Sequence, residues 1–213
     1  MKGVIFDMDG TMFDSEKIWR DMWQHLPEEY GLEQDPTLGP DVCGTTGIEM
    51  RSIIKRHFPD LDEYELTMRG RKRYHDRITK AQPEEKPGLH ELISHLKNLG
   101  YHLAIASGSD QDVIRLNLKR ANLSSFFEAT ISGNDVVHGK PAPDIFLESA
   151  RQIGCNPEEC YVIEDGENGI RAAFAAGCTP IMVPDTTPPT EEMRKMCSGI
   201  YETLFDIIPV IHE

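Results

Sequence analysis

Four short apolar runs, each ending in polar or acidic residues, constrain the fold of this chain most strongly. They are Gly3–Phe6 before Asp7 and Asp9, His102–Ala106 before Ser107, Cys160–Ile163 before Glu164 and Asp165, and Thr179–Val183 before Pro184 and Asp185. Runs of four or five apolar residues bounded by Gly or Asp are typical of strands that are buried on both faces, as in a parallel sheet. The runs therefore predict a sheet whose strands lie inside the protein.

Helical patterns lie between these runs. Residues Leu89–Leu99 carry leucines at positions 89, 92, 96 and 99 and are followed by Gly100, a common residue just after a helix. Further helices are predicted over Asp112–Ala121, Asp144–Ile153 and Gly169–Ala176. Alternation of strands and helices, with glycine at helix ends, predicts an α/β fold with a doubly wound parallel sheet.

The segment from residue 15 to residue 82 interrupts this alternation. It contains only helical patterns, at Glu16–Leu26, Gly47–His57 and Asp62–Ile78, before Pro83 and Pro87–Gly88 mark a return to the sheet pattern. We therefore predict an α-helical domain of residues 15–82, inserted into a core domain of residues 1–14 and 83–213. Residues 51–80 hold nine Lys or Arg against five Asp or Glu, a pattern that favours solvated helix faces.

The overall charge argues against several classes of partner. The 36 Asp and Glu outnumber the 22 Lys and Arg, for a formal net charge of −14, and this field repels nucleic acids and anionic membranes. Five scattered cysteines without a C-x-x-C motif indicate reduced thiols, and neither a disulfide framework nor a zinc site. The lack of an 18-residue apolar run, and a strand pattern directly after Met1, predict no transmembrane helix and no signal peptide. We expect a cytoplasmic monomer.

The polar residues at the ends of the predicted strands form the candidate site. Ligands of open α/β sheets bind outside the carboxyl ends of the strands, where Asp7, Asp9, Glu164 and Asp165 are expected to meet. Four carboxylates at one edge would repel each other without a cation between them, and Mg²⁺, which prefers oxygen ligands, suits this set. Because a carboxylate can attack phosphorus, Asp7 is the candidate nucleophile and Asp9 the candidate general acid and base.

Groups that could bind phosphate are expected at the same edge. The hydroxyl groups of Thr11 and Ser107, with backbone N–H groups near Gly10 and Gly108, could hold phosphate oxygens. Lys140, in a proline-rich segment that precedes a predicted helix, offers a positive charge.

Each of these residues has a plainer interpretation when it is taken alone. The D-x-D-G sequence also occurs in calcium-binding loops, but an EF-hand alignment places Ile5 at the first ligand position, where it cannot bind metal. Ser107 alone is more typical of a helix N-cap, and Lys140 alone of a solvated lysine. Glu164 and Asp165 alone fit the acidic start of a helix. Their joint placement at strand ends favours a catalytic site.

Four motifs in this order resemble those of the haloacid dehalogenase-like hydrolase superfamily, namely Asp7–Thr11, Ser107, Gly139–Pro141 and Glu164–Gly166. The helical insert after the first motif resembles the cap domain of the β-phosphoglucomutase-like phosphatase branch. The resemblance covers nearly the whole chain. It implies a Rossmann-like core, a mobile helical cap and Mg²⁺-dependent transfer of a phosphoryl group.

The resemblance also implies a role for each motif residue. Asp7 would be the nucleophile, Asp9 the general acid and base whose main-chain carbonyl also binds Mg²⁺, and Lys140 would steady the charge between nucleophile and phosphoryl group. The remaining assignments are phosphate binding by Thr11, Ser107, Gly108 and Lys140, and metal binding by Asp7, Asp9, Glu164 and Asp165. Gly166 departs from the family pattern, in which serine is common, and leaves the surroundings of the metal open.

Two kinds of enzyme fit these motifs. One is a phosphatase that hydrolyses a small sugar or polyol phosphate through an aspartyl phosphate, and the other is a sugar-phosphate mutase. Such mutases usually carry His in the first cap helix, where Trp19 aligns, and Arg in the cap loop. Here the loop Cys43–Glu49 has no Arg before Arg51, so a bisphosphate intermediate would be poorly retained and a phosphatase is predicted.

Other chemistries fit the sequence less well. A haloacid dehalogenase does not need Asp9, and the phosphonate hydrolases, which use a cap lysine such as Lys55, lack this second aspartate. A binding protein without activity is disfavoured because no motif residue is missing. Candidate substrate contacts in the cap are Trp19, Thr45, Thr46 and Arg71. For Trp19 and Trp23, which lie four residues apart, packing is an equally good interpretation.

Overall fold

The computed structural model describes residues 2–42, 45, 47–186 and 188–211. The chain divides into two compact units. Met1–Asp14 and Glu84–Glu213 form the first, here called the sheet unit, and Ser15–Pro83 form the second, here called the helical unit. None of the helices in the described ranges is long and apolar enough to cross a membrane.

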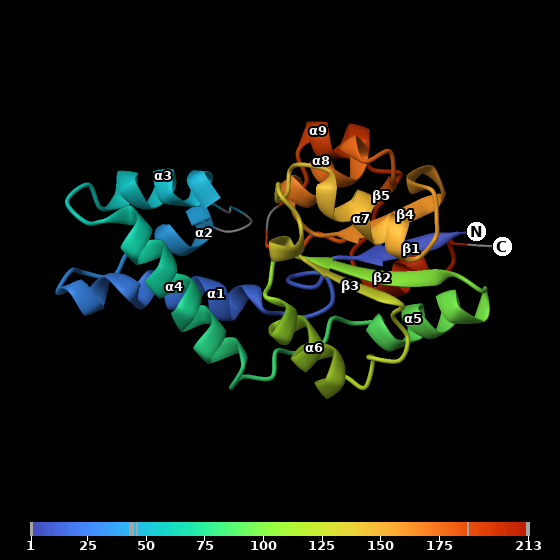
Figure 1. Cartoon of the computed structure of the whole chain (residues 1–213), viewed down its shortest axis with the longest axis horizontal. Coiled ribbons are helices and arrows are strands. Elements are labelled where there is room, and N and C mark those ends of the chain that lie inside the picture. Colours follow the sequence, from blue (N-terminus) through green and yellow to red (C-terminus); the bar gives the residue numbers. More distant parts are fainter. Residues whose placement is uncertain (1, 43–44, 46, 187, 212–213) are drawn as a thin grey trace. The chain divides into compact units, whose positions relative to one another are not determined.

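Six strands of the described chain form one parallel sheet in the order β3-β2-β1-β4-β5-β6 (Figure 1). They are β1 (Gly3–Phe6), β2 (His102–Ser107), β3 (Ala129–Ser132), β4 (Cys160–Glu164), β5 (Thr179–Met182) and β6 (Gly199–Ile200). The predicted α/β fold with a doubly wound sheet is confirmed, because every neighbouring pair runs parallel. Strands β3 and β6 were missed because β3 is half polar and β6 has only two residues.

Helices cover both faces of this sheet (Figure 1). One face carries α5 (Leu89–Asn98) and α6 (Gln111–Arg120), and the other carries α7 (Asp144–Gln152), α8 (Glu167–Ala175) and α9 (Glu191–Met196). Single 3₁₀ turns complete the unit at η2 (Gly133–Asp135), η3 (Pro157–Glu159) and η4 (Leu204–Ile207). Of the leucines that predicted α5, those at positions 89, 92 and 96 lie on its buried side, as expected for an amphipathic helix, and the partly buried Leu99 follows its last residue.

The strand order places the functional edge of the sheet. Phe6 at the end of β1 pairs with Ile105 of β2 on one side and with Ile163 of β4 on the other. The chain order runs outward from β1 in both directions, and in such sheets ligands bind outside the carboxyl ends of the strands near this reversal. The register therefore brings the residues that follow Phe6 next to those that end β2 and β4.

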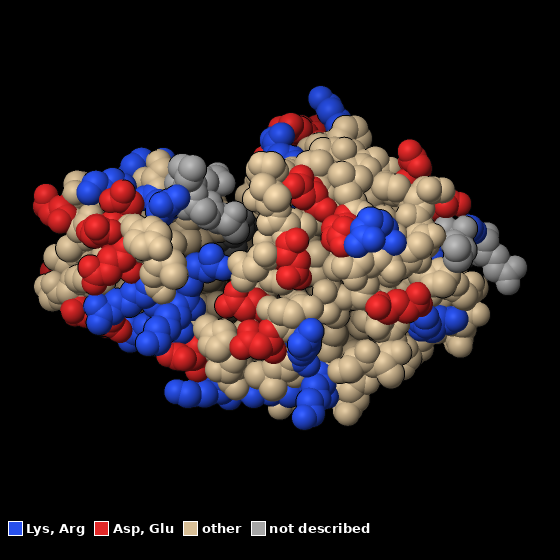
Figure 2. Space-filling model, viewed as in Figure 1, with Lys and Arg blue, Asp and Glu red and all other residues tan. Residues whose placement is uncertain are grey.

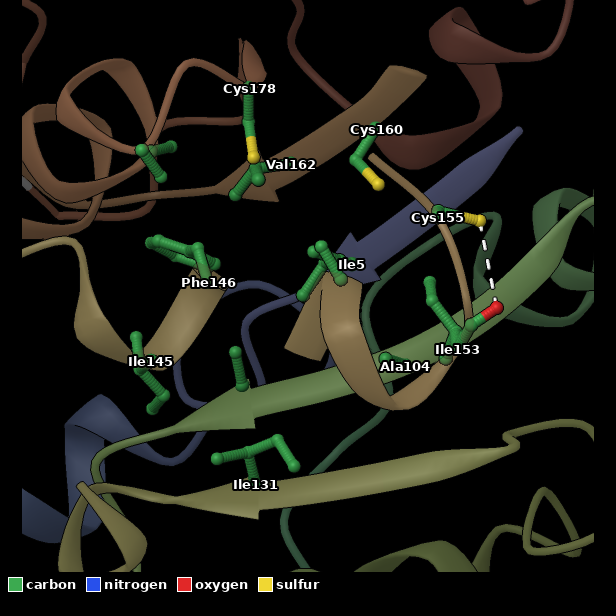
Figure 3. Packing of buried hydrophobic residues seen from close by; sticks show 14 of the residues in the cluster. Ile5, Ala104, Ile131, Ile145, Phe146, Ile153, Cys155, Cys160, Val162 and Cys178 are labelled. Carbon is green, nitrogen blue, oxygen red and sulfur yellow. Dashed lines mark hydrogen bonds between the residues drawn. The ribbon is translucent and has the colours of Figure 1, made fainter. Parts of the chain in front are cut away.

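The apolar core between the sheet and α7 fixes this register (Figure 3). Ile5 of β1 and Phe146 of α7 are fully buried in it. Three free thiols, those of Cys155, Cys160 and Cys178, belong to the same cluster. Burial raises the pKa of Cys160 and of Cys178 to about 12, so these two side chains are neutral and pack as small apolar groups.

The helical unit contains α1 (Glu16–His25), η1 (Leu26–Tyr30), α2 (Leu38–Val42), α3 (Gly47–His57) and α4 (Glu63–Ile78). Helices α1, α3 and α4 agree with the three predicted helices. Asp62 caps α4, because its side chain accepts a hydrogen bond from the N–H of Glu65 at 2.8 Å. Helix α2 was missed because Gly39 and Pro40, both weak helix formers, lie within its five residues.

Aromatic side chains form the centre of the helical unit. Trp23 is fully buried in an apolar cluster to which all four helices contribute. Trp19 is half-buried, and its ring lies edge-on to Trp23 and to Tyr74 at centroid distances of 5.5 and 4.9 Å. Both tryptophans therefore pack within this unit, and the substrate contact predicted for Trp19 stays a prediction.

Gly70 of α4 lies against the indole ring of Trp23. A Cβ atom at position 70 would come within 2.3 Å of the ring. We expect Gly70→Ala to lower the free energy of unfolding of the helical unit by about 1–3 kcal/mol, because overpacking of a dense core outweighs the better helix propensity of Ala. Both tryptophans of the chain lie in this unit, so tryptophan fluorescence during urea denaturation measures the change.

The exposed Lys72 on the same helix provides the control for this measurement. Lys72→Ala should change the stability by less than about 0.5 kcal/mol, as is usual for surface sites. A Gly70→Ala midpoint equal to or above that of the wild type would show that the ring does not restrict position 70.

Candidate active site

Three strand ends supply the residues at the carboxyl edge of the sheet. Asp7 follows β1 directly, Ser107 is the last residue of β2, and Glu164 is the last residue of β4. The N–H of Asp7 donates to the carbonyl of Ile163 at 2.9 Å, which continues the β1–β4 ladder by one residue. Only 5% of the surface of Asp7 and 3% of that of Glu164 is exposed, so both carboxylates are held in a nearly water-free edge.

The Lys140 ammonium connects these strand ends. Its Nζ donates to Asp7 Oδ1 at 2.5 Å, to Glu164 Oε1 at 2.7 Å and to the carbonyl of Ala106 in β2 at 3.1 Å. An ammonium has three N–H donors, and these three acceptors can use all of them. Lys140 thus bridges β1, β2 and β4 with charge-assisted hydrogen bonds.

Electrostatics keep this lysine charged. Burial alone would lower the pKa of Lys140, but the carboxylates of Asp7 and Glu164 raise it above its ordinary value. Burial raises the pKa of Asp7, and Glu164 and Asp9 add to that rise while Lys140 opposes it. The ionised form of Asp7, which a nucleophile requires, therefore depends on the positive charge of Lys140.

Two serines hold the second carboxylate, Asp9. Its Oδ2 accepts hydrogen bonds from Ser107 Oγ at 3.1 Å and from Ser109 Oγ at 2.7 Å. The N–H of Ser109 donates in turn to Ser107 Oγ at 3.0 Å. Ser109 was not among the predicted site residues, although its place after Ser107 and the exposed Gly108, in the turn that leaves β2, was the available signal.

Thr11 and Asp165 meet beside a glycine. The fully buried Thr11 donates from Oγ1 to Asp165 Oδ1 at 3.3 Å. Gly10 has a φ of +84°, and a Cβ atom there would come within 2.4 Å of Asp165 Oδ2. Glycine is required at this point by its backbone conformation and by the close approach of the carboxylate.

A second glycine makes room for Glu164. A Cβ atom at Gly169 in α8 would lie 1.7 Å from Glu164 Oε1, so no other residue fits without moving this carboxylate. Glu164 Oε2 accepts a hydrogen bond from the N–H of Gly166 at 2.8 Å, at the start of α8. The sequence pattern indicated Gly169 only as a helix residue, since nothing local shows what lies against it.

The acidic residues at this edge suit a hard divalent cation. Carboxylate oxygens of Asp7, Glu164 and Asp165 lie within 4.8 Å of one another. Lys140 donates hydrogen bonds to two of these three carboxylates. Its single positive charge does not neutralise all three, so the site can accept a further cation. Oxygen donors at this spacing match a small ion such as Mg²⁺. Both oxygens of Glu164 already accept hydrogen bonds, so Asp7 and Asp165 are the better placed ligands.

The structure thus brings together the predicted core residues of the site, while those predicted in the insert lie in the helical unit. Trp19 packs as described above. Thr45 turns its hydroxyl to the carbonyl of Val42 at 2.8 Å. Arg71 is exposed on α4, and Thr46 lies outside the described residues.

Many cations of the helical unit have acidic partners within the unit. Basic and acidic side chains are interleaved on its visible face (Figure 2). Arg69 and Arg73 both form ion pairs with Glu29, and Arg77 forms one with Asp21. The excess of basic residues in positions 51–80 is therefore offset by acidic residues earlier in the same unit.

Comparisons with known proteins place these observations in a family. Residues 4–183 match the family model described as haloacid dehalogenase-like hydrolase. The chain is 32% identical over 186 residues to the fructose-1-phosphate phosphatase YqaB of Escherichia coli, covering 85% of this chain and 95% of that protein. It is 31% identical to the β-phosphoglucomutase of Bacillus subtilis, covering 88% and 85%. A crystal structure of a hydrolase from Pseudomonas syringae superposes with a TM-score of 0.82 at 25% identity, covering 98% and 97%.

Replacement of Lys140 by Met should destabilise the sheet unit in a pH-dependent way. Loss of one partner from a buried ion pair typically costs about 3–5 kcal/mol. In the folded wild type, burial already raises the pKa of Asp7 although Lys140 opposes that rise. In the variant nothing opposes it, so Asp7 of the folded chain keeps its proton to a still higher pH than Asp7 of the unfolded chain. The folded state then binds more protons, and its stability falls as the pH rises. We expect a larger deficit relative to the wild type at pH 8 than at pH 5, measured by urea denaturation in EDTA.

A surface ion pair provides the control for Lys140→Met. Lys97 pairs with Glu128 at 3.0 Å, with 34% and 39% of their side chains exposed. Lys97→Met should cost less than about 1 kcal/mol at either pH, because exposed pairs contribute little. A Lys140→Met protein as stable as the wild type, or with the same deficit at both pH values, would contradict the assignment of a buried charge cluster.

Proposed function

We propose that this chain, which belongs to the haloacid dehalogenase-like hydrolases, hydrolyses a small sugar or polyol phosphate through an aspartyl phosphate. It is a phosphoric monoester hydrolase of their β-phosphoglucomutase-like branch. The observation that carries the proposal is the hydrogen bond from the Lys140 ammonium to the buried Asp7 carboxylate. Asp9 lies two residues further along the chain. The name of the Escherichia coli relative, a fructose-1-phosphate phosphatase, supports the substrate class.

In the first step, an oxygen of Asp7 attacks the phosphorus atom and the bond from phosphorus to the substrate oxygen breaks. The Asp9 carboxyl group gives its proton to that leaving oxygen, which departs as a free hydroxyl. Lys140, bonded to Asp7, offsets the negative charge of the nucleophile and of the arriving phosphoryl group. Thr11, Ser107 and Gly108 would hold the phosphoryl oxygens, for which the serine must turn its hydroxyl away from Asp9.

In the second step, water attacks the phosphorus atom of the aspartyl phosphate. The Asp9 carboxylate takes a proton from this water, the bond from Asp7 to phosphorus breaks, and inorganic phosphate is released. Asp7 returns as a carboxylate and Asp9 as a carboxyl group. Ser109, which donates to Asp9 Oδ2, would keep this residue near one position for both proton transfers while Ser107 binds the phosphoryl group.

We propose that Asp7 and Asp165, with the main-chain carbonyl of Asp9, would hold Mg²⁺, and that Glu164 supports the site by fixing Lys140. When bound, Mg²⁺ would supply charge that neutralises the phosphoryl group. The donor set supports this assignment, because three carboxylates gather at one edge.

The helical unit is proposed to act as a cap. Its chain enters directly after the loop that carries Asp9 and Thr11 and leaves before residue 84. A mobile unit attached at this loop could admit substrate and then exclude water during transfer to Asp7. Trp19, Thr45, Thr46 and Arg71 remain the proposed substrate contacts of the cap.

A sugar-phosphate mutase is the second candidate, because the Bacillus subtilis relative is named β-phosphoglucomutase. A mutase must retain a bisphosphate and return its phosphoryl group to a different hydroxyl. The loop Cys43–Glu49 holds no Arg for a second phosphate, and Trp19 is engaged in packing with Trp23 and Tyr74. These features favour transfer to water.

Activity is expected to require Mg²⁺. EDTA should abolish hydrolysis of p-nitrophenyl phosphate and added Mg²⁺ should restore it. Ca²⁺ should inhibit, because the larger ion accepts more oxygen ligands and can engage both oxygens of Asp7. Initial rates with each ion test this, and full activity in EDTA, or equal rates with Ca²⁺ and Mg²⁺, would refute the metal assignment.

The products distinguish phosphatase from mutase. We expect a hexose 1-phosphate and fructose 1-phosphate to yield free sugar and inorganic phosphate, even with added hexose 1,6-bisphosphate. Phosphorus NMR over time follows every phosphorylated species in one sample. Predominant conversion of the hexose 1-phosphate to hexose 6-phosphate, with little inorganic phosphate, would make the protein a mutase.

A further inference from the structure

The loop after Asp7 folds back on itself through its backbone. The N–H groups of Met12 and Phe13 both donate to the carbonyl of Met8, at 2.9 and 3.1 Å, and the N–H of Gly10 donates to the carbonyl of Phe13 at 2.9 Å. Asp9 and Phe13 consequently form a β-bridge. The position of the Asp9 backbone therefore depends on the position of Phe13.

A second chain segment holds Phe13 from its other side. Phe13 forms an antiparallel bridge with Glu85. The N–H of Asp14 donates to the carbonyl of Glu84 at 2.8 Å, and the N–H of Lys86 donates to the carbonyl of Met12 at 2.9 Å. Residues 84–86 thus form the outer strand of a small ladder whose inner member is Asp9.

The side chain of Lys86 anchors this outer strand to the sheet. Its Nζ donates to Asp185 Oδ1 at 2.6 Å, just after β5. The two side chains are only 18% and 12% exposed. Within the part of the chain that the structure describes, the buried Oδ2 of Asp185 has no hydrogen-bond partner. Asp185 thus depends on Lys86 for compensation of its charge, and the pair fixes residue 86 in place.

We propose that Lys86, held by Asp185, is a positioning residue for Asp9. The path runs from the ion pair through the backbone of residues 84–86 and Phe13 to the backbone of Asp9. The inference rests on the proposed function, in which Asp9 is the general acid. Lys86 itself takes no part in the chemical steps.

A displaced general acid has a specific kinetic signature. The value of kcat/KM covers the steps up to departure of the leaving group, and protonation by Asp9 matters most for a strongly basic leaving oxygen. A p-nitrophenolate ion departs readily without a proton, whereas a phenolate ion does so poorly. Misplacement of Asp9 should therefore slow phenyl phosphate more than p-nitrophenyl phosphate, whereas general damage to the site slows both equally.

The test is a series of substituted phenyl phosphates, with log(kcat/KM) plotted against the pKa of the released phenol. For Lys86→Met we expect a steeper negative slope than for the wild type, with an additional loss of about tenfold for phenyl phosphate relative to p-nitrophenyl phosphate. This is less than the roughly 10²–10⁴-fold that a general acid contributes, because Asp9 is displaced and not removed. Lys86→Arg, which keeps the charge, should restore the wild-type slope. Asp9→Asn, which removes the acid, should give the steepest slope.

Two further variants separate positioning from loss of stability. Lys86→Met with Asp185→Asn leaves no buried unpaired charge and should show the same steep slope in a protein that folds. Lys97→Met, in a surface pair of the same unit, should match the wild type. If Lys86→Met and the double variant both had the wild-type slope while Asp9→Asn had a steep one, the positioning role of Lys86 would be overturned and the proposed function would stand. A wild-type slope in Asp9→Asn would overturn the assigned role of Asp9 and with it the proposed function.

Discussion

The Lys140 ammonium, bonded to the ends of three parallel strands, is the interaction on which the rest of the site depends. It contacts Asp7, Glu164 and the carbonyl of Ala106, and it supplies the positive charge that lets two buried carboxylates lie side by side. Without it, burial and repulsion from Glu164 and Asp9 would raise the pKa of Asp7 further. The same contact therefore contributes to folding of the edge and favours the ionised form of Asp7 that its proposed role as nucleophile requires. A cation held by Asp7 and Asp165 would complete the neutralisation that Lys140 begins.

The strand order explains why these groups meet although they lie far apart in the sequence. Strand β1 lies between β2 and β4, so the residues that end these three strands share one edge. Space at that edge is limited, and two glycines provide it. Gly10 accommodates the carboxylate of Asp165, and Gly169 accommodates that of Glu164. Packing beneath the edge, between the strands and α7, keeps the register that this arrangement requires.

The sequence predicts the residues proposed to carry out the chemistry better than it predicts the residues that hold them in place. Asp7, Ser107 and Glu164 could be predicted because each follows or ends an apolar run, and the parallel-sheet rule brings such positions together. Ser109 and Gly169 were missed because their importance lies in contacts with residues distant in sequence, Asp9 for the first and Glu164 for the second. The ion pair of Lys86 with Asp185 spans 99 positions, and no local pattern indicates it. Two weak strands, β3 and β6, form because neighbouring strands supply partners, which local propensity does not reveal.

The central claim is that Asp7 forms a covalent bond to phosphorus. The most direct test mixes the Asp9→Asn variant with p-nitrophenyl phosphate and Mg²⁺, quenches in acid and maps the phosphoryl group by mass spectrometry. This substrate needs little protonation of its leaving group, whereas hydrolysis of the intermediate lacks its base, so the intermediate should accumulate. The account predicts a burst of one p-nitrophenolate per protein molecule and a phosphoryl group on Asp7. A burst with the phosphoryl group on another residue, or with none on the protein, would contradict it.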